Sequence, residues 1–522
     1  MIDRLRTFPG AVRGLLAVVS GVTTGLAFAP TGWWPLVFVG VAGLSVLVAA
    51  GKRVVGVAML GFCHGLGLTA TTLNWMRSIF LEAMVALVVV VASFYIVLAL
   101  AIRLGRRLPV WPLVAAGCWT ALEFTICRWP FDGFGWVRLG YAMIDSPLAG
   151  GYPLLGVAGV TFLTALVGQT LAWLVVDGWR RFVPTAGVIV ACLALAGAGF
   201  AVPAGQLGQT SGSDRVAVGW VQGGAPGGGV YGLGPVRTIT TNERDGTVKL
   251  AAQVATRALP PPDFVVWPEE GTDLDPSQDA ATLAMVRQSL DAVGTPILIG
   301  SVLVGPGPDQ RRTASQWWDP DAGVVTTYVK RGIVPFGEWV PYRDVLLPLV
   351  PALKYVGNQS VPGTQPGVLD VTLPDGRPLK LGVLVCFDLA FDAVAYDTTK
   401  FGAQLLVVQS SNAMYQGTGQ IEQQFAMTRA RAAELRRDIL VVTTSGVSGF
   451  IAPDGSVLSR VSDPGTAFGV QTMALRQGAT PAVWLAQPVE LALVVLTAGC
   501  LLVAVFRSPG TMRPSPKPRK TA

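Results

Sequence analysis

The sequence predicts an α/β domain inserted in an all-α bundle of eight transmembrane helices. Of 522 residues, 51% are hydrophobic and only 14% are charged, whereas soluble domains average about 25% charged residues. Seven long apolar segments precede residue 205 and an eighth follows residue 480. We therefore predict a membrane domain (1–204), an extracytoplasmic catalytic domain (205–480), an eighth helix (481–506) and a basic cytoplasmic tail (507–522).

The apolar segments have the length that a bilayer requires, which is about 20 residues of helix. The first resembles a signal peptide, but six more segments follow it, so a retained helix is expected. The eight predicted spans are roughly 11–29, 34–50, 54–72, 83–102, 110–126, 154–176, 183–204 and 484–506.

Basic residues alternate between the loops and predict the orientation of the chain. One side carries fifteen: Arg4, Arg6, Arg13, Lys52, Arg53, Arg103, Arg106, Arg107, Arg180, Arg181, Arg507, Arg513, Lys517, Arg519 and Lys520. The short loops of the other side carry three: Arg77, Arg128 and Arg138. Both termini are therefore predicted to be cytoplasmic, and residues 205–480 extracytoplasmic. Since these loops explain the net charge of +7, we expect no nucleic-acid partner.

The cysteines and the single histidine exclude several kinds of site. Five of the six cysteines lie in or beside apolar segments and none forms a CxxC pair, so we expect no metal site, no disulfide framework and no cofactor. The one histidine, His64, lies in an apolar segment, where a packed helix residue is expected. Any mechanism with a histidine base would have to use it.

Between residues 205 and 480, short β-rich runs alternate with helical patterns, which favours sheets covered by helices. The predicted strands are 215–222, 263–267, 296–304, 323–329, 379–385, 404–409 and 439–444. The predicted helices are 236–257, 280–292, 391–401 and 419–437. Turns are expected at Pro374-Asp375-Gly376 and Pro453-Asp454-Gly455. The glycine run 227–232 matches GxGxxG, but Gly234-Pro235 interrupts the helix start, so we expect a flexible loop.

Three chemically active residues each follow a predicted strand: Glu269, Lys330 and Cys386. A lone cysteine is usually a small apolar residue. At the carboxyl end of a strand, however, it reaches the crevice where α/β folds place their chemistry. A nucleophilic thiol requires a base and a group that stabilises the oxyanion. Without a histidine nearby, a carboxylate and an ammonium group must supply these functions.

The motifs around these residues resemble those of a known superfamily. Trp267-Pro-Glu269, Tyr328-Val-Lys330 and Val385-Cys-Phe-Asp388 are similar to the three catalytic motifs of the nitrilases. The extension Val334-Pro-Phe-Gly-Glu-Trp-Val-Pro341 resembles the apolipoprotein N-acyltransferase family more specifically. Further likenesses are 140–148, 155–159, Ser411-Asn412 and Arg429-x-Arg431-Ala-x-Glu434.

The resemblance implies a nitrilase-like αββα sandwich inserted in the eight-helix bundle, in a bacterial plasma membrane. It implies Glu269 as general base, Lys330 as oxyanion stabiliser and Cys386 as nucleophile. Supporting roles fall to Glu338, Asp388, Phe387 and Asn412, while Glu270 is expected to be a solvated neighbour. The family pattern differs here at Gly332, Phe387, Asp388 and 413–416, which puts donor preference in doubt more than reaction type.

The implied reaction transfers an acyl chain from a membrane phospholipid, through a cysteine thioester, to a protein. The acceptor is the α-amino group of the N-terminal diacylglyceryl-cysteine of an apolipoprotein. Three alternatives remain open: a membrane-anchored amidase or nitrilase-type hydrolase, an inactive relative that binds lipoproteins, and a transporter. The last is disfavoured because the spans contain few charges and no internal repeat is visible.

Two further features bear on the membrane. The segment 339–356 is apolar and includes Trp339, Leu346 and Leu347, but Pro348 and Pro351 interrupt it. We expect a mobile arm that contacts lipid; a core segment with turns is the alternative.

Inside the fifth span lies Glu123, which is costly to bury. It is expected to pair with Arg128 or to line a polar pocket.

Overall fold

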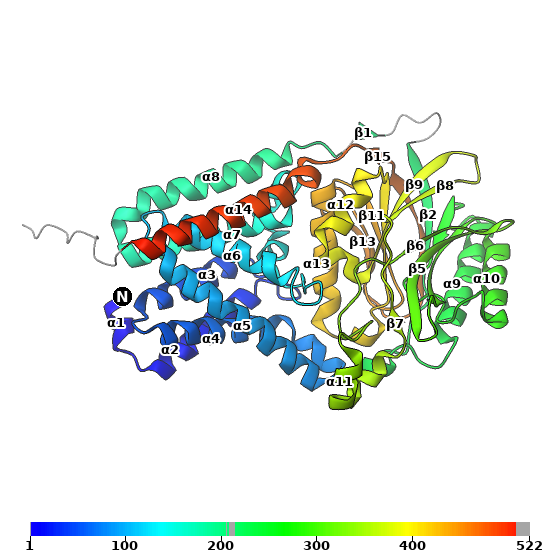
Figure 1. Ribbon diagram of the computed structural model, residues 1–522. Coiled ribbons are helices and arrows are strands. Elements are labelled where there is room, and N and C mark those ends of the chain that lie inside the picture. Colours follow the sequence, from blue (N-terminus) through cyan, green and yellow to red (C-terminus); the bar gives the residue numbers. More distant parts are fainter. Residues whose placement is uncertain (1, 205, 208–213, 508–522) are drawn as a thin grey trace, which may run out of the picture.

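The computed structural model describes residues 2–204, 206–207 and 214–507. Figure 1 shows a bundle of helices beside a two-sheet sandwich, with the first and last long helices of the chain both in the bundle. The predicted basic tail, from residue 508 onward, lies outside the described residues.

Each of the eight predicted apolar segments forms a helix. These helices are α2 (Gly10–Gly25), α3 (Leu36–Ala50), α4 (Val54–Thr72), α5 (Leu81–Gly105), α6 (Trp111–Ile126), α7 (Tyr152–Asp177), α8 (Phe182–Phe200) and α14 (Pro481–Phe506). Short helices join them: α1 (Ile2–Thr7), η1 (Asn74–Ser78), η2 (Leu139–Met143), η3 (Pro147–Gly151) and η4 (Trp179–Arg181). Within the described residues, five helical runs are long and apolar enough to cross a membrane: Val54–Thr72, Leu81–Gly105, Pro147–Asp177, Trp179–Phe200 and Pro481–Phe506. The apolar α2 and α3 are shorter.

His64 has the packed position expected of it. It is fully buried on α4, where its ring contacts the rings of Tyr95 and Trp119. Its Nδ1 lies 3.1 Å from Ser20 Oγ.

Two sheets form the centre of the other half. The six-stranded sheet has the order β13-β12-β11-β10-β9-β8, and the seven-stranded sheet the order β14-β2-β3-β4-β5-β6 with β7 beside β5. The strands of the first are β8 (Val368–Thr372), β9 (Pro378–Val385), β10 (Leu405–Ser410), β11 (Ile439–Thr443), β12 (Ser448–Ile451) and β13 (Val457–Val461). Those of the second are β2 (Arg215–Gln222), β3 (Phe264–Val266), β4 (Ile297–Val304), β5 (Gln310–Asp319), β6 (Gly323–Val329), β7 (Gln359–Ser360) and β14 (Ala467–Ala474). A small pair, β1 (Gln206–Leu207) and β15 (Arg476–Gln477), lies apart from them.

Helices cover both outer faces of the sandwich. On the far side from the bundle lie α9 (Thr238–Ala255) and α10 (Ala280–Val293). Between the six-stranded sheet and the bundle lie α12 (Asp392–Lys400) and α13 (Gly419–Leu435) (Figure 1). One apolar core fills the space between the sheets. Another runs without a break from the bundle through α12 and α13 to the outer face of the six-stranded sheet, so the two halves share a core.

The strands bring the predicted site residues to one place. β2, β3 and β4 are parallel, as are β9, β10 and β11. Chemistry in such sheets collects where the strands end. Glu269 comes shortly after β3, Lys330 directly after β6 and Cys386 directly after β9. The two predicted proline turns join β8 to β9 and β12 to β13, with Gly376 and Gly455 at positive φ.

Candidate active site

Lys330 is clamped between two carboxylates. Its Nζ lies 3.0 Å from Glu269 Oε1 and 3.0 Å from Glu338 Oε1. The lysine side chain is only 2% exposed, so it depends on these partners for its charge. Burial works against that charge, but the two carboxylates raise the pKa of Lys330 well above its usual value. The ammonium group is therefore held protonated and fixed in direction.

The remaining oxygens of these carboxylates bind backbone N–H groups. Glu269 Oε2 accepts from Ser411 at 3.0 Å, and Glu338 Oε2 accepts from Val334 at 2.7 Å. Each glutamate is thus held through both of its carboxylate oxygens. The structure brings Glu269, Lys330 and Glu338 together as a rigid group.

Cys386 lies on a strained turn. It opens the short helix η7 (Cys386–Ala390) with φ of +50°, in the left-handed region that non-glycine residues rarely adopt. Residues with such strain cluster at active sites, ligand clamps and switch regions. Its Sγ accepts a hydrogen bond from Gln424 Nε2 at 3.4 Å. Burial and the Glu269 carboxylate raise the pKa of the thiol, against the lowering effect of Lys330.

Asp388 joins the lysine motif to the cysteine turn. Its Oδ2 accepts from Val385 N and from the Tyr328 hydroxyl, both at 2.9 Å, and its Oδ1 accepts from Gly332 N at 2.7 Å. The carboxyl group is fully buried. Burial raises the pKa of Asp388, although these donors oppose the change. Asp388 thus contacts residues that support the site, namely Val385, Tyr328 and Gly332.

The other predicted supporting residues have different surroundings. Phe387 is buried and stacks on Phe134 and Trp136, which follow α6, so it packs the turn against the bundle. Asn412 is buried with φ of +59°, and its Oδ1 has no hydrogen-bond partner among the described residues. Glu270 was expected to be solvated, which is wrong: it is half-buried, and burial and the neighbouring Glu269 raise its pKa.

The predicted arm folds as two short helices, α11 (Arg343–Leu349) and η6 (Pro351–Val356). Pro351 begins the second helix, whereas Pro348 lies inside the first. The arm rests on the loops of the bundle through aromatic rings. Phe131 contacts Phe336, Trp339 and Tyr342, and Phe80 contacts Tyr355. Its leucine and valine side chains differ in exposure: Val345 and Leu349 are 62% and 72% exposed, whereas Leu346 and Leu347 are half-buried.

A cavity of about 550 Å³ opens beside the ends of α4 and α5. It is lined by Asn74, Trp75, Arg77, Ser78, Leu81, Gly417, Thr418 and Gly419. Trp75 also packs edge-on against Tyr415, with ring centroids 5.3 Å apart. Burial raises the pKa of Tyr415, and the acidic groups of Cys386 and Glu338 add to this effect.

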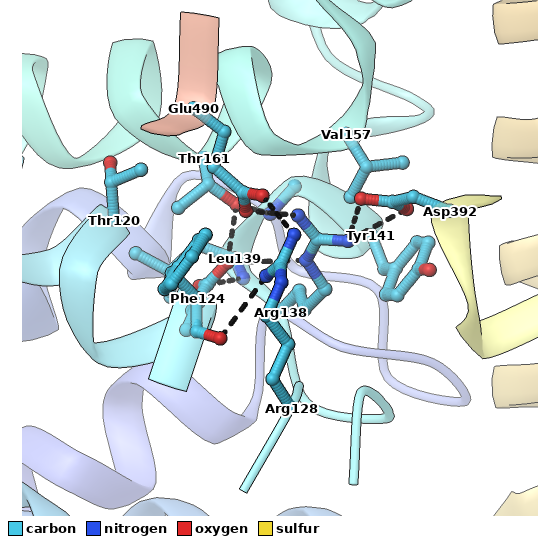
Figure 2. A network of polar contacts seen from close by, with 12 residues as sticks. Thr120, Phe124, Arg128, Arg138, Leu139, Tyr141, Val157, Thr161, Asp392 and Glu490 are labelled. Atoms are coloured by element: carbon cyan, nitrogen blue, oxygen red, sulfur yellow. Dashed lines mark hydrogen bonds and ion pairs between the residues drawn. The ribbon is translucent and has the colours of Figure 1, made fainter. Parts of the chain in front are cut away.

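The expected partner of Glu123 is wrong. Glu123 lies 3.5 Å from Arg138, while Arg128 pairs with Glu490 of α14 at 2.7 Å (Figure 2). The loop after α6 folds back, with Phe134 N donating to Ile126 O at 2.7 Å, and Arg138 lies near Glu123 although it is more distant in the sequence. Glu123 also accepts hydrogen bonds from Leu139 N and Thr161 Oγ1, each at 2.7 Å.

Sequence reasoning missed Gln424 and Tyr415. Gln424 is one of three glutamines on the predicted helix 419–437, and only the fold shows which of them faces the sulfur. Tyr415 lies in the stretch 413–416, which is expected from the sequence to differ from the family pattern.

Comparisons with known proteins agree with this architecture. Residues 20–170 match the apolipoprotein N-acyltransferase N-terminal domain, and residues 236–477 match the carbon-nitrogen hydrolase domain. The predicted nitrilase-like α/β domain and its helical N-terminal partner are therefore confirmed. An amidase of the nitrilase superfamily from Nesterenkonia AN1 overlays with a TM-score of 0.37 and 17% identity, over 55% of this chain and 98% of the amidase.

Relatives match over nearly the whole chain. The apolipoprotein N-acyltransferase of Mycolicibacterium smegmatis is 31% identical, over 100% of this chain and 89% of that protein. That of Photobacterium profundum is 26% identical, over 91% of this chain and 92% of that protein. The chain belongs to the apolipoprotein N-acyltransferase family.

Proposed function

We propose that this enzyme moves an acyl chain from a phospholipid to the α-amino group of an apolipoprotein's N-terminal diacylglyceryl-cysteine, with Glu269, Lys330 and Cys386 as its catalytic residues. The observation that carries these assignments is the clamped ammonium group. Lys330 lies 3.0 Å from Glu269, and both charges act on the thiol of Cys386. The low exposure of Glu269 and Lys330 supports a site in which a base and a cation act on the sulfur nucleophile with little water around them.

In the first half-reaction, Glu269 removes the thiol proton as Sγ attacks the ester carbonyl of the phospholipid. Charge develops on the carbonyl oxygen, where the Lys330 ammonium group stabilises it. The tetrahedral intermediate collapses, the ester C–O bond breaks, and the lysophospholipid oxygen takes the proton from Glu269. The acyl chain remains on Cys386 as a thioester.

In the second half-reaction, the acceptor amine attacks the thioester carbonyl. Glu269 takes a proton from the amine, and the sulfur leaves as the C–S bond breaks. Return of that proton to Cys386 restores the enzyme. An amine reacts readily with a thioester, so the route favours transfer when water is excluded.

Both lipid substrates present their reacting groups at the bilayer surface. We assign the cavity beside Trp75 and Arg77 to the phospholipid, and the exposed leucines and valines of the arm to contact with lipid. The assignment needs the catalytic domain on the extracytoplasmic side, with eight crossings and both termini cytoplasmic. The positive-inside distribution of arginine and lysine supports that orientation.

The decisive experiment is a mass measurement on the full-length protein in phospholipid vesicles, with the acyl chain of the donor varied. We expect an adduct on Cys386 whose mass follows the donor chain, and an N-acylated lipopeptide after acceptor is added. Release of free fatty acid without N-acyl product would favour the hydrolase instead. Absence of any Cys386 adduct, with binding of lipopeptide retained, would favour an inactive relative.

A further inference from the structure

A buried network of charged side chains joins the bundle to the catalytic domain (Figure 2). The bundle supplies Glu123, Arg138 and Glu490, and the domain supplies Asp392, Arg431 and Glu434. All six are buried, the most exposed being Asp392 at 9%. Buried charges are costly unless each is paired, so the network holds the two halves in one relative position.

Asp392 of α12 is the bridge between the halves. Arg138 Nη1 donates to both its carboxylate oxygens at 2.9 Å, and Arg431 Nη2 donates to Oδ1 at 2.7 Å. Burial opposes ionisation, but the two guanidinium groups lower the pKa of Asp392 below its usual value. A single carboxylate thus binds one arginine from the bundle and one from α13.

Arg431 extends this bridge to the nucleophile turn. Its Nε donates to the carbonyl oxygen of Leu389 at 2.9 Å, and Leu389 belongs to η7, which begins at Cys386. From the bundle, the Tyr141 hydroxyl lies 3.4 Å from the same carbonyl oxygen and accepts from Arg431 Nη2 at 3.0 Å. The turn that holds the strained cysteine is therefore fixed from the membrane side.

We propose that Arg431, Asp392 and Tyr141 are positioning residues, which hold the Cys386 turn in its reactive conformation through Leu389. They make the geometry of the thiol depend on correct seating of the catalytic domain on the bundle. The inference rests on the proposed function in one respect: Cys386 is taken as the nucleophile. Its consequence is that a substitution in the bundle slows a reaction of a sulfur atom in the other domain.

The same helix offers a matched control. Arg429, two residues before Arg431, also bridges to the bundle, where Asp145 accepts from it at 2.6 and 3.1 Å. Its Nε donates to Gly455 O at 2.9 Å. These contacts dock the domain without touching η7. Loss of docking alone and loss of turn positioning can therefore be separated.

The experiment compares full-length Arg431→Lys, Tyr141→Phe and Arg429→Lys in phospholipid vesicles. One readout is single-turnover formation of the Cys386 thioester at varied donor concentration. The other is alkylation of Cys386 by iodoacetamide, located by peptide mass spectrometry, which requires no lipid substrate. Unfolding temperatures are measured on the same samples.

We expect Arg431→Lys to reduce the maximal acylation rate at least tenfold, with the donor concentration for half-maximal rate changed less than threefold. Tyr141→Phe should reduce that rate about threefold to tenfold, and both variants should slow alkylation. Arg429→Lys should stay within twofold of the parent in both readouts. Rates within twofold of the parent for Arg431→Lys, or an equal loss in Arg429→Lys, would overturn the proposal.

Two further outcomes are also decisive. If Arg431→Lys does not fold, Tyr141→Phe decides alone, because it removes one hydroxyl and keeps the ring; unchanged alkylation would then refute positioning from the bundle. If the parent forms no thioester from phospholipid, the proposed function fails. The alkylation rates still test whether these residues position Cys386.

Discussion

The carboxylate of Asp388 accepts a 2.7 Å hydrogen bond from the backbone N–H of Gly332. Both positions are expected from the sequence to differ from the pattern of the resembled family, and in the structure the two residues are in direct contact. A Cβ at residue 332 would lie 2.6 Å from the Phe391 ring and 3.0 Å from Asp388 Oδ1. The close approach of Asp388 to the backbone therefore requires a residue without a side chain at position 332.

Asp388→Asn should therefore damage the site without touching the reacting atoms. All three partners of the carboxylate are donors, so an amide must turn its own N–H groups toward one of them. A buried polar group without a partner costs about 1–3 kcal/mol. We expect a lower unfolding temperature and at least tenfold slower acyl transfer. Asp370→Asn, at an exposed ion pair with Lys380, is the control and should change neither.

Lys330→Met tests the role of the two ion pairs that Lys330 forms with Glu269 and Glu338. Removal of the cation leaves Glu269 and Glu338 as buried carboxylates without their ion-pair partner, and breaking such a pair costs about 3–5 kcal/mol. We expect no detectable acyl transfer and a clear fall in the unfolding temperature. Glu422→Gln is the control, because its partner Arg460 is partly exposed and such surface pairs contribute about 0–1 kcal/mol. A stable, active methionine variant would contradict the proposed role of Lys330.

The thiol of Cys386 should react more slowly at neutral pH than an ordinary cysteine. Burial and Glu269 raise its pKa, so the protonated form dominates at pH 7 and the thiolate fraction grows as the pH rises. We expect the rate of alkylation by iodoacetamide to increase steadily from pH 7 to 9 without a plateau. Glu269→Gln removes the charge that raises the pKa, so it should speed alkylation at pH 8 and abolish acyl transfer. A plateau below pH 7 in the parent would show a preformed thiolate.

The sequence predicted the elements whose pattern is regular. β2 and β6 have the predicted limits, 215–222 and 323–329, because each is a short β-rich run between clear breaks. β5 (Gln310–Asp319) was missed because it starts with polar residues and reads as a loop. Its partners on both sides, β4 and β6, stabilise it as a strand. Pairing between strands is a tertiary effect that the local pattern does not contain.

The same limit applies to the site. Motifs identified Glu269, Lys330 and Cys386, since each follows its own strand. The partner of Glu123 was misassigned because Arg128 is close in sequence, whereas Arg138 is close in space. The bond from Arg431 to the Leu389 carbonyl joins residues 42 apart. Neither residue type nor spacing indicates such a contact.

If the arm contacts lipid, substitutions in it should weaken the apparent affinity for the phospholipid donor. Leu346→Ser with Leu347→Ser should raise the phospholipid concentration for half-maximal rate several-fold, with the unfolding temperature unchanged. Val345→Ser with Leu349→Ser should have the larger effect, because these side chains are more exposed. Val248→Ser, on α9 at the far side of the sandwich and 41% exposed, is the control. Equal donor dependence in all variants would refute lipid contact by the arm.

Substitution of Gly156 should lower the stability of the protein. It breaks α7 with φ of +68°, and the freed N–H of Val157 donates to Glu434 of the catalytic domain at 2.8 Å. A Cβ at residue 156 would lie 2.5 Å from the Tyr396 hydroxyl and 2.7 Å from the Ala486 Cβ. Left-handed backbone and overpacking together predict a loss of about 2–5 kcal/mol for Gly156→Ala. The measurement is thermal unfolding of the full-length protein in detergent.

The control for that substitution is Gly187→Ala, inside α8, where a Cβ would meet nothing within 4 Å. Alanine in an open helical position stabilises by about 0.5–1 kcal/mol relative to glycine, so this variant should unfold at the same or a higher temperature. The same change from glycine to alanine is therefore expected to lower the unfolding temperature at residue 156 and to keep or raise it at residue 187. If Gly156→Ala also leaves the unfolding temperature unchanged, the break in α7 does not require a glycine.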